Sequence, residues 1–345
     1  KEGLDLEQSL KIAKVFQAAG HIDFFNAIYG RMDTYAALAI DNMPGMASPD
    51  APWLSRAAAF KAEINLPVFH AARIADVATA RHAISEGLID LVGMTRAHIA
   101  DPYLVAKIAA GEEDRIRPCV GTTHCMGHMR PTCVHNPATG HEAVLKQVIA
   151  PADTQRTVVI VGAGPGGLEA ARVCGERGHK VTVLEAAPKA GGQILLAAKA
   201  SWRKNLVGIV DWRINELDRL GVDIRYNTYA DADQIAAFAP NLVIIATGGV
   251  PNFDRMLGHE LITSSWDILD GTVKPESDVL VVDGTGRHAA LSAADLCHRL
   301  GSNVRMSIID DALAAEQTYS EQVIWRKWAR QIDLPVHREE LLMKV

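Results

Sequence analysis

Three cysteines and three histidines lie within one stretch of eighteen residues, CVGTTHCMGHMRPTCVHN at 119–136. Thiolates are the usual ligands of iron–sulfur clusters, which normally take four of them. Three thiolates with one histidine also suit a tetrahedral structural zinc site. A loop without metal is the third interpretation. The candidate metal ligands are Cys119, Cys125 and Cys133, with His124 or His128 as a possible fourth.

A glycine pattern further along the chain predicts a dinucleotide site. The motif G-x-G-x-x-G occurs at Gly162, Gly164 and Gly167, between an expected strand and an expected helix. Such glycines permit a tight turn, a close approach of backbone amides to a pyrophosphate, and close helix–strand packing. The free N–H groups of the helix terminus face the phosphates. Glu185 ends the next strand, where a carboxylate can accept hydrogen bonds from a ribose.

A second, weaker glycine turn follows the strand DVLVVD. Gly284 and Gly286 are present, but Ala289 replaces the third glycine. Asp283 stands just before the turn, where its charge would repel a pyrophosphate. Asp310 could still bind an adenine ribose. The sequence therefore leaves two interpretations open, an NAD(P)H site or a unit with a structural role alone.

Two arginines follow consecutive expected strands in the first third of the chain. Arg73 lies in HAARIAD and Arg96 in VGMTRAHIADP. Phosphate sites of (β/α)₈ barrels form at the carboxyl ends of the last two strands, and the rigid fork of arginine suits phosphate. The two side chains could bind one phosphate together. A surface salt bridge is the alternative for either one alone.

The elements that must position these residues alternate between helix and strand, so the fold class is α/β with parallel sheets. Residues 1–112 are expected to form part of a barrel, or a small open sheet, because a complete barrel needs about 250 residues. Residues 113–150 hold the cysteines and a linker. A Rossmann-like domain is expected at 151–270, and the start of a second nucleotide-binding unit at 271–345.

The composition narrows the class of protein. Apolar residues make up 48% of the 345, and the net charge is −6 without a basic tract, which argues against nucleic acid as a partner. No apolar run reaches the length of a membrane span. Five cysteines in a long chain argue against a disulfide framework and favour the cytoplasm. The chain starts at Lys1, and both ends are expected to be cuts.

The order of these features resembles the NADH:flavin oxidoreductase family of trimethylamine dehydrogenase and 2,4-dienoyl-CoA reductase. The branch that it resembles most is that of the N-methyl amino acid demethylases, which act on dimethylglycine or N-methylproline. The segments CVGTTHC, CVHNPATGHE and VDGTGRHAALSAADL carry this likeness. AAPKAGGQI and IIATGG also resemble two-dinucleotide-domain flavoproteins, in which the Gly-Gly-Gln turn lies near FAD. In this chain that turn includes Gly192 and Gln193.

The resemblance implies FMN in the barrel, a 4Fe-4S cluster beside it, and FAD or ADP in the next domain. Ala72–Arg73 and Thr95–Arg96 would bind the FMN phosphate. Cys119 and Cys125 match the first and third positions of the family's C-x-x-C-x-x-C pattern, whereas Thr122 occupies the second. The first half of the barrel is absent, so no catalytic residue is assigned.

The activity implied is oxidative N-demethylation of an N-methylated amine or amino acid. An NAD(P)H-dependent enoate or 2,4-dienoyl-CoA reductase is the alternative, and a nucleotide-binding module without turnover is the alternative of another class. This chain is expected to be inactive by itself. An electron-transfer flavoprotein is the expected protein partner, and the complete protein is expected to be a homo-oligomer.

Overall fold

The computed structural model describes residues 3–127, 129–253 and 257–345, so the candidate ligand His128 lies outside the described residues. The chain divides into two compact units, Lys1–Thr139 and Gly140–Val345. Each unit is described by itself. No helix within the described ranges is long and apolar enough to cross a membrane.

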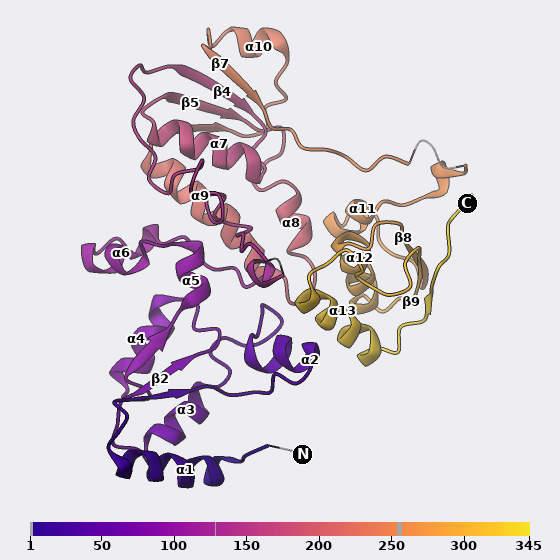
Figure 1. The fold of residues 1–345 in the computed structure, drawn as a ribbon. Coiled ribbons are helices and arrows are strands. Elements are labelled where there is room, and N and C mark those ends of the chain that lie inside the picture. Colours follow the sequence, from indigo (N-terminus) through magenta and orange to yellow (C-terminus); the bar gives the residue numbers. More distant parts are fainter. Residues whose placement is uncertain (1–2, 128, 254–256) are drawn as a thin grey trace. The chain divides into compact units, whose positions relative to one another are not determined.

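The first unit is built on a parallel sheet with the order β1-β2-β3 (Figure 1). Phe25 is paired with Val68, and Phe69 with Leu91. Asp5 and Asp76 cap α1 and α4 by accepting backbone N–H bonds, a role that short acidic side chains favour. The elements are α1 Leu6–Ala19, β1 Phe25–Ala27, α2 Tyr35–Ala37, a π-helix Leu38–Asn42, α3 Leu54–Lys61, β2 Val68–Ala71, α4 Val77–Ser85, β3 Leu91–Gly93, α5 Thr95–Ala100, α6 Leu104–Ala110, and 3₁₀ turns Glu113–Arg115 and His124–Met126.

The second unit contains two parallel sheets, with the orders β6-β5-β4-β7 and β10-β9-β8. In Figure 1, α7 and α9 lie side by side on one face of the first sheet. The elements are β4 Thr157–Val161, α7 Pro165–Glu176, β5 Lys180–Leu184, α8 Gln193–Ala197, a 3₁₀ turn Lys204–Val207, α9 Gly208–Arg219, β6 Asp223–Arg225, α10 Ala232–Ala236, β7 Leu242–Ile245, a 3₁₀ turn His259–Leu261, α11 Ser265–Asp270, β8 Asp278–Asp283, α12 His288–Arg299, β9 Asn303–Ile308, α13 Tyr319–Gln331 and β10 Val336–His337.

Each sheet of the second unit has its own core. Val158, Ile160 and Val183 are fully buried between the first sheet and α7, as expected of near-continuous apolar runs in parallel strands. The second core is centred on Trp325 of α13, which is fully buried against Met306 of β9. The two glycine turns follow β4 and β8, at the carboxyl ends of strands that these cores fix in place.

The α/β class, the parallel sheets and the Rossmann-like domain agree with the sequence prediction. The sequence pattern also predicts a helix at about Trp202–Leu220, but the helix, α9, begins at Gly208. Trp202 packs instead against Trp325, with the ring centroids 4.5 Å apart. The short helix α5 was not anticipated. The domain boundaries at 112, 150 and 270 stay predictions.

Candidate flavin-binding sites

The segment after β2 places an arginine in a strained backbone position. Ala72 and Arg73 have φ angles of 126° and 52°, a region that L residues rarely adopt. Such strain persists where the surrounding structure enforces it, often at binding sites. The Arg73 side chain is buried, and its Nε lies 3.0 Å from Oδ1 of Asp50. The predicted phosphate ligand is thus fixed inside the first unit.

Arg96 lies in the first turn of α5, one residue after the exposed Thr95. Its Nη1 donates to the carbonyl of Pro44 at 2.8 Å. Burial lowers the pKa of Arg73, the Asp50 carboxylate opposes this, and the charge of Arg96 lowers that pKa further. The two guanidinium groups are therefore close enough to repel one another. An anion between them would offset both the repulsion and the burial, so these residues fit a phosphate.

Gly121 joins this arginine to the cysteine loop. It has a φ of +77°, and a Cβ built on it would lie 2.6 Å from Nη1 of Arg73. Its backbone N–H donates to the thiol of Cys119, and its carbonyl accepts from the N–H of Met46 at 2.8 Å. Only glycine permits this close approach of the loop to the guanidinium.

The three predicted cysteine ligands influence one another's charge. Burial raises the pKa of the Cys119 thiol, and it raises that of Cys125 to about 11, with contributions from the neighbouring thiols. Cys133 accepts a hydrogen bond from the N–H of His135 at 3.4 Å. However, no three His, Cys, Asp or Glu side chains in the described part of the chain are arranged to hold a metal ion. The residues thus do not form a ligand set, and the cluster stays a prediction.

The first glycine turn fits a dinucleotide. A Cβ on Gly162 would lie 2.4 Å from the carbonyl oxygen of Ala246, and one on Gly167 would lie 1.9 Å from that of Gly162. By contrast, a Cβ on Gly164 would meet nothing within 4 Å. The fold therefore requires glycine at positions 162 and 167. Gly164 instead leaves open space at the N-terminus of α7, where a pyrophosphate would bind.

The other predicted FAD residues lie around this turn. Glu185 accepts the N–H groups of Ala163 at 2.6 Å and Ala187 at 2.8 Å, one on each carboxylate oxygen. Each oxygen retains a lone pair for a ribose hydroxyl. A Cβ on Gly192 would lie 3.2 Å from Cα of Gly164. Nε2 of Gln193 donates to the carbonyl of Gly249 at 3.3 Å, which brings the Gly-Gly-Gln and Ala-Thr-Gly-Gly segments together.

The second glycine turn is occupied by its own carboxylate. Oδ1 of the buried Asp283 accepts bonds from the N–H of Thr285 at 2.9 Å, the hydroxyl of Thr285 at 2.9 Å and the N–H of Gly286 at 3.1 Å. A Cβ on Gly286 would lie 2.7 Å from a carboxylate oxygen of Asp310, whereas Gly284 has open space. The amides that a pyrophosphate would need are already paired with an anion.

Comparison with known proteins places these features in a family. The family model of the NAD(P)-binding Rossmann-like domain matches residues 160–203. A multifunctional alkene reductase/demethylase from Caballeronia cordobensis is 50% identical over 347 residues, covering 100% of this chain and 51% of that protein. The chain belongs to the trimethylamine dehydrogenase and old yellow enzyme-like family.

Other members of this family extend the comparison. A probable N-methylproline demethylase from Rhizobium meliloti (strain 1021) is 44% identical over 96% of this chain and 50% of its own length. The solved structure of a 2-naphthoyl-CoA reductase has a TM-score of 0.89 and 29% identity, covering 98% of this chain and 52% of that one. The chain spans about half the length of the curated relatives that it matches.

Two residues that lie against Arg73 were missed by sequence reasoning. Asp50, the ion-pair partner of Arg73, lies in a loop with no motif, and only the fold brings it there. Gly121 lies between Cys119 and Cys125, and a glycine at that place could have indicated a close approach of the backbone to another group.

Proposed function

We propose that the complete protein oxidises an N-methyl group of a small amine or amino acid and releases formaldehyde. The observation that carries this proposal is the buried Arg73 with the half-buried Arg96 beside it, a phosphate-type site in a chain 44% identical to a probable N-methylproline demethylase. FMN, when bound there, supplies the hydride acceptor. FAD or its ADP part would bind at the first glycine turn.

The oxidation of the amine needs only the flavin, as hydride acceptor, and water. Bound FMN would accept a hydride from the methyl carbon, which would leave the amine as an iminium cation. Water then adds to the methylene carbon, the C–N bond breaks, and formaldehyde and the demethylated amine leave with one proton. The protein's contribution is to bind and orient the flavin and the substrate.

The arginines of this chain would bind the flavin phosphate and would take no part in the reaction itself. Arg73 is held by Asp50 and Arg96 by the Pro44 carbonyl, so both guanidinium groups are oriented before a phosphate arrives. Ala72 and Thr95 stand beside them at the strand ends. Preorganised, charge-assisted contacts of this kind are the strong ones.

The reductase alternative rests on the name of the Caballeronia relative, which is both an alkene reductase and a demethylase. A reductase fed by NAD(P)H needs an open nicotinamide dinucleotide site. The three hydrogen bonds that Asp283 accepts in the second turn argue against such a site there. We therefore favour the oxidative direction, with the electrons passing to an external acceptor such as an electron-transfer flavoprotein.

The remaining parts of the proposal concern metal, assembly and location. A 4Fe-4S cluster at Cys119, Cys125 and Cys133 stays within the proposal, although the described residues do not form a ligand set. A partial barrel at 1–112, a homo-oligomer and a cytoplasmic location are also proposed. All five cysteines are free, which supports a reducing compartment.

Anaerobic reduction of the flavin tests the direction of the reaction. The full-length holoenzyme is mixed with N-methylproline, dimethylglycine or NADH, and the flavin absorbance is followed. We expect the N-methylated amino acids to bleach the flavin and NADH to leave it oxidised over the same time. Bleaching by NADH alone would contradict the proposal and favour the reductase.

A further inference from the structure

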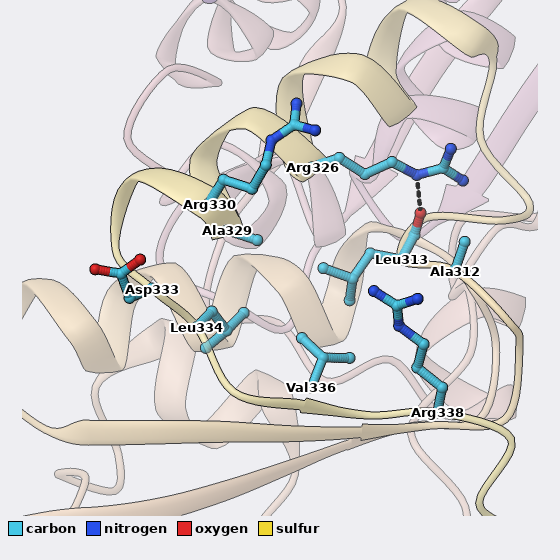
Figure 2. A pocket seen from close by; sticks show the side chains of 9 residues that line it. All are labelled: Ala312, Leu313, Arg326, Ala329, Arg330, Asp333, Leu334, Val336 and Arg338. Atoms are coloured by element: carbon cyan, nitrogen blue, oxygen red, sulfur yellow. Dashed lines mark hydrogen bonds between the residues drawn. The ribbon is translucent and has the colours of Figure 1, made fainter.

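A pocket of about 510 Å³ lies beside the sheet β10-β9-β8 of the second unit, and no residue of either glycine turn lines it. It is bounded by the loop after β9, by α13, and by β10 with the residue that follows it (Figure 2). Its lining residues are Ala312, Leu313, Arg326, Ala329, Arg330, Asp333, Leu334, Val336 and Arg338. Volumes of this size are typical of sites for small organic molecules.

Three of the lining side chains are arginines, and one is an aspartate. Arg326 is half-buried, and its Nε donates to the Leu313 carbonyl at 2.9 Å, which fixes the guanidinium and leaves its Nη groups available. In Figure 2, Arg326 and Arg338 extend from α13 and from the end of β10 to either side of Leu313. None of the three arginines forms an ion pair with any described residue. The pocket therefore carries an excess of positive charge.

The inner wall of the pocket is apolar. Leu313 and Ala329 are buried, while Leu334 and Val336 are partly buried and pack against the core around Trp325. An inorganic ion alone would leave this wall in contact with water. An apolar body would gain about 25 cal/mol for each Å² of apolar surface that it removes from water.

The geometry points to a binding site for an organic anion, in which a carboxylate or phosphate group terminates an apolar body. The charged group would lie between Arg326 and Arg338, with Arg330 at the rim, and the body would lie against Leu334 and Val336. The pocket runs along β10, from Asp333 and Leu334 before the strand to Arg338 after it, with Ala312 and Leu313 contributed by the loop after β9. This inference does not depend on the proposed demethylation.

Binding to the full-length, flavin-loaded protein tests the inference, with calorimetric titration of four probes. Octanoate and octyl phosphate carry both features, octanol lacks the charge, and inorganic phosphate lacks the apolar body. We expect saturable binding of at least one of the first two, at least tenfold tighter than octanol and inorganic phosphate. Octanoate against octyl phosphate distinguishes a carboxylate from a phosphate ligand.

Variants locate the binding. Arg338→Ala removes an exposed guanidinium, and it should weaken the tighter probe at least tenfold without loss of folding. Arg305→Ala, an exposed arginine of β9 outside the pocket, is the matched control and should leave binding unchanged. Equal affinity for octanol and both anions would overturn the inference, as would equal effects of the two variants.

Discussion

Gly121 shows how one residue can serve two sites. Its N–H contacts the Cys119 thiol, its carbonyl holds Met46, and its Cα lies against the Arg73 guanidinium. A side chain at this position would push on the phosphate arginine and on the cysteine loop together. Gly111 offers a comparison, because its φ of +74° is nearly the same and its Cβ would meet nothing within 4 Å.

Gly121→Ala should therefore weaken FMN binding in the full-length protein, whereas Gly111→Ala should not. Both variants carry nearly the same backbone strain, so the difference reports the contacts of the new methyl group, of which the one with Arg73 at 2.6 Å is the tightest. A displaced charge-assisted contact costs about 1.5–3 kcal/mol, roughly a tenfold to hundredfold loss of FMN affinity. Fluorescence titration of the apoprotein with FMN measures it.

Arg73→Ala separates the possible failures of that experiment. If Arg73→Ala leaves FMN affinity unchanged, the phosphate site is assigned wrongly. If Arg73→Ala weakens FMN binding but Gly121→Ala behaves like Gly111→Ala, the site stands and the role of Gly121 is wrong.

Gly164 provides the corresponding test at the first dinucleotide turn. Its backbone is extended, with φ −70° and ψ 178°, and the space around its Cβ position is open. Gly164→Val should therefore fold but place methyl groups where a pyrophosphate binds. We expect the purified variant to lack FAD, measured by its absorbance after denaturation, while Gly166→Ala on the exposed first turn of α7 retains it. Full FAD content in Gly164→Val would disprove the assignment.

At the scale of elements, the N-terminus of α12 carries a half-buried histidine, His288, whose surroundings favour its neutral form. Nε1 of Trp325 donates to Nδ1 of His288 at 3.0 Å, so this nitrogen must carry a lone pair. Nη1 of Arg203 lies 3.1 Å away, and Arg203 is also 3.3 Å from Oε2 of Glu321. Burial first, and the Arg203 charge second, lower the pKa of His288 from 6.5 to about 3.

This histidine should make the stability of the protein depend on pH. Its folded-state pKa is below the unfolded value, so its contribution is complete above pH 6.5 and is lost as the pH falls towards 3. The slope is at most about 1.4 kcal/mol per pH unit. Burial raises the pKa of Glu321, which acts in the opposite sense. Thermal unfolding from pH 7 to pH 4 measures the sum.

Substitution isolates the His288 contribution. His288→Gln keeps an acceptor for Trp325 but does not titrate, so its Tm should fall less between pH 7 and pH 4 than that of the unaltered protein. His298→Gln, on an exposed position of the same helix, is the control and should behave like the unaltered protein. The same pH dependence in all three proteins would contradict this account.

Local sequence patterns predicted the helices and strands, but they could not predict contacts between residues that are far apart in the sequence. The first glycine turn and its strand–helix context were predicted because all its residues lie within a few positions of each other. The start of α9 was misplaced, because the burial of Trp202 against Trp325 depends on residues more than a hundred positions apart. At the second glycine turn, the sequence indicated that the charge of Asp283 would repel a pyrophosphate. The three hydrogen bonds that Asp283 accepts from the turn were not predicted.

At the scale of the whole molecule, the phosphate arginines and the first glycine turn belong to separate compact units. Sequence resemblance identified the family, because the motifs are short and ordered along the chain, and the cofactor sites that it implies stay predictions. It missed Asp50, which reaches Arg73 only through the folded loop before α3. The chain spans about half the length of its curated relatives, so the proposed activity is tested on the full-length protein.

Formaldehyde release is the most direct test of the central claim. The full-length holoenzyme is incubated with N-methylproline carrying ¹³C in the methyl group, together with a one-electron acceptor. The account predicts one ¹³C-formaldehyde and one proline for every two electrons transferred. Arg73→Ala should lose this turnover in proportion to its lost FMN. Reduction of the acceptor without release of ¹³C-formaldehyde would contradict the account. So would an enzyme that reduces an enoyl thioester with NADH but oxidises no N-methylated amine.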